Sequence, residues 1–258
     1  MSTATRVPRR RSAAGIPPLR GLAPLVAVLV LWQLLAPADD PYFPPPSRWF
    51  AALGELDGAG TLWSPLLTTL VTFVIALVIA TLLGAAIGVA VGRAPGADRV
   101  LGPTFEFVRT IPAGALVPVA VLVIGYTRSM TIAVVVVTSL WPVLLATRAA
   151  ARQLDVARLE TARVLHLSRL DTFRKVVLPS LSSSMVLGLQ ISAPLALIIT
   201  IVVEMITQVD GLGKQIGLAQ SQFQAATVFG LVAVTCLIGL AVNIVAAALA
   251  RATRRYAA

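Results

Sequence analysis

Residues 159–179 read LETARVLHLSRLDTFRKVVLP, and this stretch decides how the rest of the chain is interpreted. It holds four Arg or Lys, two acidic residues and the only histidine, whereas long segments on both sides carry no charge. Locally it predicts two short helices. Asp155 is placed to cap the first, and Ser168 with Asp171 three residues later has the form of a capping box that starts the second. His166 falls at the turn between them.

The second of these helices carries an apolar stripe at helical spacing, formed by Leu167, Leu170, Phe173 and Val177. A simple linker would need neither caps nor a stripe. The pattern therefore favours a docking hairpin that offers apolar side chains to another protein. The alternative is an amphipathic hairpin lying on anionic lipid, which predicts basic residues flanking one broad apolar face.

The composition is that of a membrane protein. Of the 258 residues, 57% are hydrophobic and 12% charged, compared with roughly 45–50% and about 25% in soluble domains. A membrane span needs about 20 apolar residues, and six runs are uncharged and long enough to be considered. They predict an all-α integral membrane protein with six transmembrane helices: Leu22–Ala36, Leu66–Gly92, Ile111–Tyr126, Ser129–Thr147, Leu181–Val203 and Gln215–Ala250.

The charges are distributed unevenly between the two sides that six spans define. The N-terminal tail, the loop at 93–109, the loop at 148–179 and the C-terminal tail hold 18 Arg or Lys and 5 Asp or Glu. The other three segments hold 3 and 6, so that +13 and −3 sum to the net charge of +10. This is the positive-inside pattern, which predicts that both termini and the hairpin are cytoplasmic. It also explains the positive charge without nucleic acid as a partner.

Prolines fall inside three of the expected spans. They predict a third span that is bent or begins irregularly, and breaks in the fourth and fifth. Irregular backbone at membrane depth is tolerated where protein or a water-filled cavity covers it. The prolines therefore indicate either a transport pathway or simple packing kinks: Pro112, Pro118, Pro142 and Pro194.

A few polar residues within the spans are further pathway candidates. Gln190 and Asn243 are costly to leave unpaired in lipid, and Glu204, at the end of the fifth span, belongs either to a gate or to the membrane interface. Small residues spaced by four in the second span indicate either a close packing seam or ordinary tolerance of glycine: Gly84, Gly88 and Gly92.

The hairpin resembles the coupling loop of bacterial ABC-importer permeases, whose pattern is Glu-Ala-Ala-x3-Gly-x9-Ile-x-Leu-Pro. Two departures are mild, Thr for Ala and Val for Ile. The third places His166 where glycine serves a tight turn. Because histidine tolerates positive φ better than most residues, the turn is expected to survive at a cost of about 1 kcal/mol. The alternative is a role for His166 in sensing pH or contacting the ATPase. The matching positions are Glu160, Thr161, Ala162, His166, Val176, Leu178 and Pro179.

The resemblance covers about residues 40 to 255 and points to the branch that handles nitrate, taurine, alkanesulfonates and thiamine-precursor pyrimidines. One departure is Thr72, where many members carry Arg in the second span. The shared motifs are Pro46-Ser47 before the second span, Arg109-x-Ile111-Pro112 and Leu116-x-Pro118 in the third, and Glu204 followed by Gly211-Leu212-Gly213.

The resemblance implies a type I ABC-importer permease fold, with the chain as half of a homodimeric pore in a bacterial inner membrane. Two copies of an ATPase would dock on the hairpin, and an extracytoplasmic binding protein would deliver a small solute such as a sulfonate, taurine or nitrate. Glu160 would orient the hairpin by pairing with a nearby arginine or a backbone donor, or would merely pair with Arg163 three residues later. The apolar docking residues would be Leu165, Leu167 and Leu170.

The chain has no GxxxxGK[ST] phosphate loop, so it is not expected to be an enzyme or to bind a cofactor. The rival functions are a secondary transporter and a channel subunit without an ATPase. The expected parts are a disordered basic cytoplasmic tail at 1–20, a first transmembrane helix with an external interfacial segment at 21–63, an ABC transmembrane type-1 domain at 64–251 with its coupling loop at 152–179, and a cytoplasmic tail at 252–258. Membrane lipid would surround the spans.

Overall fold

The computed structural model describes residues 18–37 and 40–255 of the chain. All regular secondary structure in these residues is helical, which confirms the expected all-α class. The tail predicted at 1–20 lies almost entirely outside the described residues, as do the last residues of the tail predicted at 252–258.

The described residues form a series of α-helices interrupted by one π-helical turn. In chain order they are α1 (Pro18–Leu35), α2 (Pro46–Gly58), α3 (Trp63–Gly92), α4 (Pro95–Val108), α5 (Ala113–Ile124), α6 (Arg128–Arg152), α7 (Val156–Val164), α8 (Arg169–Thr172), the π turn η1 (Phe173–Val177), α9 (Leu178–Thr207), α10 (Leu212–Ser221) and α11 (Ala225–Arg255).

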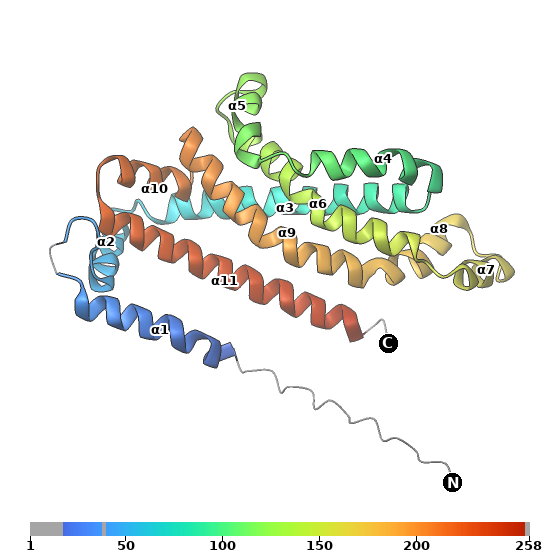
Figure 1. Ribbon diagram of the computed structural model, residues 1–258, viewed down its shortest axis with the longest axis horizontal. Helices are drawn as coiled ribbons and strands as arrows, with labels where there is room; N and C mark the ends of the chain where they lie inside the picture. Colours follow the sequence, from blue (N-terminus) through green and yellow to red (C-terminus); the bar gives the residue numbers. More distant parts are fainter. Residues whose placement is uncertain (1–17, 38–39, 256–258) are drawn as a thin grey trace, which may run out of the picture.

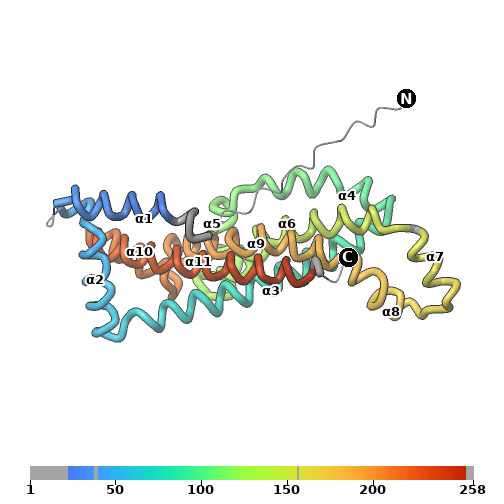
Figure 2. The backbone as a smooth tube through the Cα atoms, turned by 90° about the horizontal axis from the view of Figure 1, so that it is seen from below, coloured from blue at the N-terminus to red at the C-terminus, as the bar shows by residue number. Residues whose placement is uncertain are grey.

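The long helices lie side by side in an elongated bundle (Figures 1 and 2). α6 packs along α3 and α9, and α11 packs on α9. α2 and α10 lie at one end of the bundle, whereas α7 and α8 project beyond the other. α1 is joined to the rest at Trp32, whose ring centroid lies 5.0 Å from that of Trp49 in α2 and 5.2 Å from that of Phe229 in α11.

Four helical segments are long and apolar enough to cross a membrane: Trp63–Gly92, Arg128–Arg152, Arg169–Thr207 and Ala225–Thr253. α4 and α5, bent by 94°, qualify together as one broken span, and α1 adds a shorter apolar helix at Ala23–Leu35.

The third run contains the helix α5, whose ends lie two residues inside each predicted bound. α5 has 12 residues, which extend only about 18 Å of the roughly 30 Å that a bilayer core requires. The loop predicted at 93–109 is instead the 14-residue helix α4, which begins with Pro95 in its first turn. α4 runs beside α3 and α6 (Figure 1), and α5, after the bend, packs on α6.

The proline prediction is confirmed for the third run and wrong for the next two. The residues 109–112 form the elbow between α4 and α5, with Pro112 at the N-cap of α5 and Pro118 inside it. Pro142 and Pro194, however, lie within α6 and α9, which continue through them. Neighbouring helices support a membrane helix at a proline, and α9 packs directly on the backbone of α6 at Pro142.

Glycines let two helices approach the backbone of α6. A Cβ atom added to Gly88 of α3 would lie 2.7 Å from the carbonyl oxygen of Leu144, and one added to Gly188 of α9 would lie 2.6 Å from the Cα of Val143. The backbone of α6 also occupies the space beside Gly84 and Gly92. The glycine spacing in the second span is therefore a packing seam, and α6 is held on both sides at backbone distance.

Candidate functional site

The hairpin at 155–179 has the two capped helices that its sequence predicts. Asp155 caps α7 by accepting the N–H of Ala157 at 2.9 Å. The Ser168 hydroxyl caps α8 by accepting the N–H of Asp171 at 3.1 Å, and it donates to the Asp171 carboxylate at 2.7 Å. These contacts confirm both predicted caps and fix the starts of both helices in a segment that projects beyond the bundle (Figure 1).

His166 forms the turn between α7 and α8 in the left-handed conformation, with φ of 51°. Its N–H donates to the Arg163 carbonyl at 2.9 Å, and the N–H of Leu167 donates to the Ala162 carbonyl at 3.0 Å. This pair of hydrogen bonds is the Schellman motif that ends many helices, usually with glycine in the left-handed position. The predicted positive φ at His166 is confirmed.

The root of the hairpin is packed against the end of α6. Val177 and Leu181 are buried against Ala151, and Leu154 and Leu159 pack on the same cluster. The π turn η1 joins α8 to α9 without an interruption of the helix. The hairpin, the last turn of α6 and the first turns of α9 therefore form one packed unit.

The predicted coupling residues divide into buried and exposed positions. Ala162 is buried, whereas the side chains of Leu165 and Leu170 are 64% and 59% exposed. Thr161 donates to the Ala157 carbonyl at 2.8 Å. Leu167 lies at the turn and Val176 in the π turn η1. Leu178 and Pro179 begin α9, and Leu178 is 40% exposed.

The expected pairing of Glu160 with an arginine or a backbone donor is not seen. Within the described residues its carboxylate has no hydrogen-bond or ion-pair partner, and the residue is exposed. Arg163, the alternative partner in the next turn, makes no ion pair with it either in this part of the chain. Glu160 thus presents an unpaired carboxylate on the surface of α7.

The elbow between α4 and α5 encloses a cavity of about 210 Å³ against α6 and α9. Arg109 and Thr138 contribute the charged and hydroxyl groups of its wall, and Trp141 contributes an indole ring. Thr138 also donates to the carbonyl of Val134 on its own helix at 2.7 Å. Ile111 and Ala113, on either side of Pro112, line the same cavity. The broken span is therefore where irregular backbone meets an internal space.

Glu204 is completely buried at the end of α9. Its Oε2 accepts the Thr69 hydroxyl at 2.7 Å and the N–H of Gly213 at 3.1 Å. The Thr69 oxygen in turn accepts the N–H of Leu212 at 2.7 Å. These contacts join α3, α9 and the first turn of α10. Space is tight, since a Cβ atom on Gly211 would lie 2.2 Å from the Glu204 carboxyl carbon.

The other two polar candidates lie away from the elbow cavity. Asn243 lines a groove of about 600 Å³ between α9 and α11, together with Cys236. Gln190 is half-buried one turn before Pro194, which lines the same groove.

Thr72 lies where many members of the resembling branch carry arginine. Here Arg128 of α6 donates to its hydroxyl through Nε at 2.8 Å and to the Thr68 carbonyl through Nη2 at 3.0 Å. A guanidinium therefore contacts this point of α3 from a neighbouring helix, which sequence position alone did not indicate.

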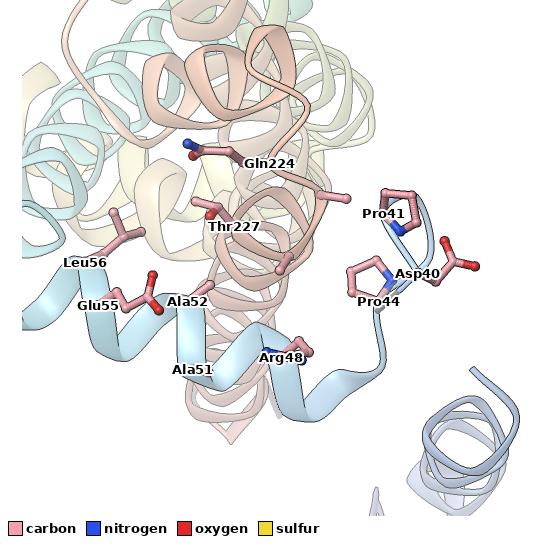
Figure 3. A pocket seen from close by; sticks show the side chains of 12 residues that line it. Asp40, Pro41, Pro44, Arg48, Ala51, Ala52, Glu55, Leu56, Gln224 and Thr227 are labelled. Atoms are coloured by element: carbon pink, nitrogen blue, oxygen red, sulfur yellow. The ribbon is translucent and has the colours of Figure 1, made fainter. Parts of the chain in front are cut away.

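A wide recess of about 600 Å³ lies at the opposite end from the hairpin, between α2 and the start of α11 (Figure 3). Asp40, Arg48 and Glu55 supply its charged groups, and Gln224 an amide. The N–H groups of Phe43 and Tyr42 donate to Asp40 and lower the pKa of that carboxyl.

A bundle of membrane-length helices with a bent helix pair beside a cavity is the architecture of a helical membrane protein. The chain belongs to the binding-protein-dependent transport system inner membrane component family, whose profile matches residues 80–255. It is therefore the permease subunit of an ABC importer.

Individual relatives agree with this family. The bicarbonate transport system permease protein CmpB of Synechocystis sp. is 29% identical over 211 residues, which cover 77% of this chain and 74% of CmpB. The Escherichia coli protein SsuC, named for aliphatic sulfonates transport, is 28% identical over 234 residues, covering 90% of this chain and 89% of SsuC. A chain of the MetNI methionine ABC transporter, solved in inward-facing conformations, has the same fold, with a TM-score of 0.63 at 17% identity over 75% of this chain and 98% of that one.

Proposed function

We propose that this chain is half of a homodimeric pore in a bacterial inner membrane, and that two copies of an ABC ATPase drive it through the hairpin at 152–179. The observation that carries the proposal is a capped, rigidly rooted hairpin with exposed leucines and an unpaired carboxylate at Glu160. Buried apolar side chains gain free energy in proportion to the area removed from water, so these leucines favour a protein partner.

The lipid alternative for the hairpin is less well supported. Val164, Leu165 and Leu170 are all more than half exposed and come from the end of α7, the turn and α8. These elements lie farthest from the bundle, beyond the ends of the long helices (Figure 2). An interfacial helix would instead lie along the membrane with a continuous apolar face.

The proposed topology has six spans, namely α1, α3, the bent α4–α5 pair, α6, α9 and α11. Both termini and the hairpin would then be cytoplasmic, as the excess of Arg and Lys on that side favours. The first helix and an external segment would occupy 21–63, and the transporter domain 64–251. α2, α10 and the recess between α2 and α11 would face outward, where an extracytoplasmic binding protein delivers the solute.

The proposed solute is a small oxyanion, because the relatives CmpB and SsuC are named for bicarbonate and aliphatic sulfonates. The elbow cavity supports this class of solute, since Arg109 supplies a positive charge and Thr138 a hydroxyl within a space of about 210 Å³. Arg109 pairs with the neighbouring Glu106 at 2.5 Å, so the cavity offers a partly neutralised guanidinium and not a permanent anion trap. Pro112 and Pro118 would shape this part of the pathway.

Co-purification tests the coupling role. The candidate ATPase is purified with the detergent-solubilised wild-type chain, with a Leu165→Asp/Leu170→Asp variant and with a Tyr42→Asp control. Tyr42 is 67% exposed in the segment before α2 and lies outside the hairpin. We expect wild type and control to retain the ATPase and the double variant to lose it. Equal retention by all three chains would refute docking on the hairpin.

Import into vesicles tests the solute. Complexes of the wild-type chain with its ATPase and binding protein are supplied separately with bicarbonate and with methanesulfonate. ATP-dependent uptake of either anion supports the oxyanion class, whereas uptake of neither would refute it while leaving the docking result intact.

A further inference from the structure

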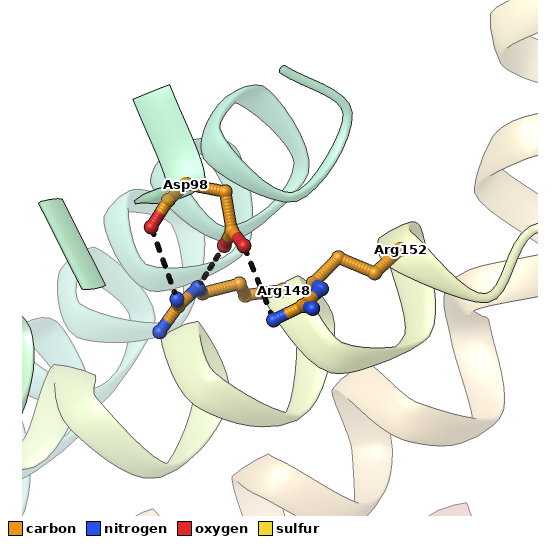
Figure 4. Close-up of polar contacts among 3 residues, drawn as sticks. All are labelled: Asp98, Arg148 and Arg152. Atoms are coloured by element: carbon orange, nitrogen blue, oxygen red, sulfur yellow. Dashed lines mark hydrogen bonds and ion pairs between the residues drawn. The ribbon is translucent and has the colours of Figure 1, made fainter. Parts of the chain in front are cut away.

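One carboxylate joins α4 to α6 at the hairpin end of the bundle. Asp98 of α4 accepts Nε of Arg148 at 2.5 Å on one oxygen and pairs with Nη1 of Arg152 at 3.1 Å on the other (Figure 4). Arg148 also reaches the backbone oxygen of Asp98 at 3.4 Å. The side chains of Asp98 and Arg148 are each only 12% exposed. The two arginines are one turn apart on α6, and both bind the Asp98 carboxylate.

The rest of α4 is shaped to receive Arg148. A Cβ atom on Gly102, one turn beyond Asp98, would lie 2.7 Å from Nη2 of Arg148. The guanidinium carbon of Arg148 lies 5.8 Å from the centre of the Phe105 ring, within the range of cation–π attraction. The Phe105 ring in turn meets that of Trp141 edge-on at 5.9 Å. Asp98, Gly102 and Phe105 are spaced by four and three residues, and therefore form one face of α4.

This face connects the hairpin to the elbow cavity. At one end Arg152 is the last residue of α6, three residues before the Asp155 cap, and Ala151 beside it is buried in the hairpin root. At the other end Trp141 lines the elbow cavity. Long side chains make the contacts between α4 and α6 along this face. The position of α4 relative to α6 therefore depends on the positions of Arg148 and Arg152.

We propose that Asp98 and Arg148 are positioning residues that transmit movement of the hairpin to α4 and so to the elbow of the broken span. The proposal rests on the proposed function, because it takes the ATPase to move the hairpin. Movement of the hairpin shifts the end of α6, with which it shares its buried root. The two arginines then carry Asp98 and the first half of the broken span with them, which changes the cavity at the other end of α4.

Spin-label distances within one subunit test this transmission. Cys236, the only cysteine of the chain, is replaced by Ser, and labels are placed on cysteines at Val100 of α4 and Val164 of α7, which are 72% and 77% exposed. A second pair joins Val164 to Phe223, which is 81% exposed at the far end of the molecule. Labelled chains are diluted with unlabelled ones, assembled with the ATPase, and measured without nucleotide and after trapping with ATP and vanadate.

With the native residues at 98 and 148, we expect trapping to change the 164–223 distance while the 100–164 distance stays the same. In Arg148→Gln the 100–164 distance should change on trapping, because α4 no longer follows the hairpin. Gly102→Val keeps every charge but displaces the guanidinium, and should behave like Arg148→Gln. Asp98→Arg/Arg148→Asp should restore the constant distance. A purely stabilising ion pair would alter the melting temperature but leave these distance changes as in wild type.

Glu106→Gln is the matched control, since it removes a carboxylate from the same helix that, within the described residues, pairs with Arg109 one turn away and with no other residue. It should keep the wild-type distances. A 100–164 distance that stays constant in both Arg148→Gln and Gly102→Val, while 164–223 changes, would overturn the proposal. Failure of the ATPase to bind the wild-type chain would instead refute the proposed function, and the transmission would fall with it.

Discussion

Replacing Glu204 should loosen the junction of α3, α9 and α10. In Glu204→Ala the Thr69 hydroxyl and the N–H of Gly213 lose their acceptor, and both are buried with the carboxylate that they bind. Each orphaned buried donor costs about 1–3 kcal/mol in water-soluble proteins, whereas interhelical hydrogen bonds in membranes average about 0.6 kcal/mol. The expected loss lies between these limits, at about 2–4 kcal/mol for the two donors.

The assay is unfolding in mixed micelles of increasing SDS fraction, with the free energy of unfolding compared between variants. Glu204→Gln keeps an acceptor oxygen in place and should lose less than half as much as Glu204→Ala. Thr200→Val is the matched control, one turn earlier on α9, because this buried hydroxyl donates only to the Ala196 carbonyl of its own helix at 2.8 Å. Wild-type stability of Glu204→Ala, or an equal loss in Glu204→Gln, would refute the assignment of the carboxylate as a structural acceptor.

Three further predictions concern single positions. His166→Gly removes the cost of a side chain in the left-handed conformation, about 1 kcal/mol, and should slow amide hydrogen exchange at the end of α7 about fivefold; unchanged exchange would show that histidine holds the turn without strain. Gly188→Ala forces apart α6 and α9, where its Cβ would lie 2.6 Å from the Val143 Cα, and should lower the free energy of unfolding by about 1–3 kcal/mol. The control Gly114→Ala has open space on α5 and should leave the free energy of unfolding unchanged. Equal effects of the two substitutions would contradict the packing seam. Ser168→Ala removes the α8 cap and should destabilise the hairpin by about 1 kcal/mol, measured as faster exchange of the 169–172 amides, and the reasoning fails if only distant amides respond.

The hairpin was the most predictable part of the structure because its signals are local. The caps at Asp155 and Ser168 act over two or three residues, and the turn at His166 is closed by hydrogen bonds within α7 and its C-terminal turn. Such contacts depend on neighbours in the sequence and not on the packing of the bundle.

The helix α4 was not predicted, because charge was used to separate loops from spans. α4 carries Asp98, Arg99, Glu106 and Arg109 at or near its surface, which made 93–109 resemble a cytoplasmic loop. Its most buried charge is compensated by Arg148, 50 residues later in the chain. Compensation across such a distance leaves no periodic or spacing signal in a single sequence.

The surroundings of Pro142 and Glu204 could not be predicted, because they depend on contacts between residues far apart in the sequence. Pro142 was expected to interrupt its helix, but the close approach of Gly188 supports α6 at that point, and a sequence does not show which helix packs where. Glu204 was expected either at a gate or at the membrane interface, and neither expectation indicated its buried partners. Its partner Thr69 lies 135 residues earlier, so only the assembled bundle reveals that it is an internal acceptor.

The π turn at Phe173–Val177 also bears on how this chain tolerates insertion and deletion. A π turn arises where one extra residue is accommodated in a helix, so the residues before and after it keep their faces. Elsewhere in a helix, losing one residue rotates everything beyond it by about 100°, which would turn Gly188 and Glu204 away from their partners. Deleting one residue within 173–177 would instead restore a regular helix. Length changes between the hairpin and the fifth span should therefore be tolerated at this turn and nowhere else along Arg169–Thr207.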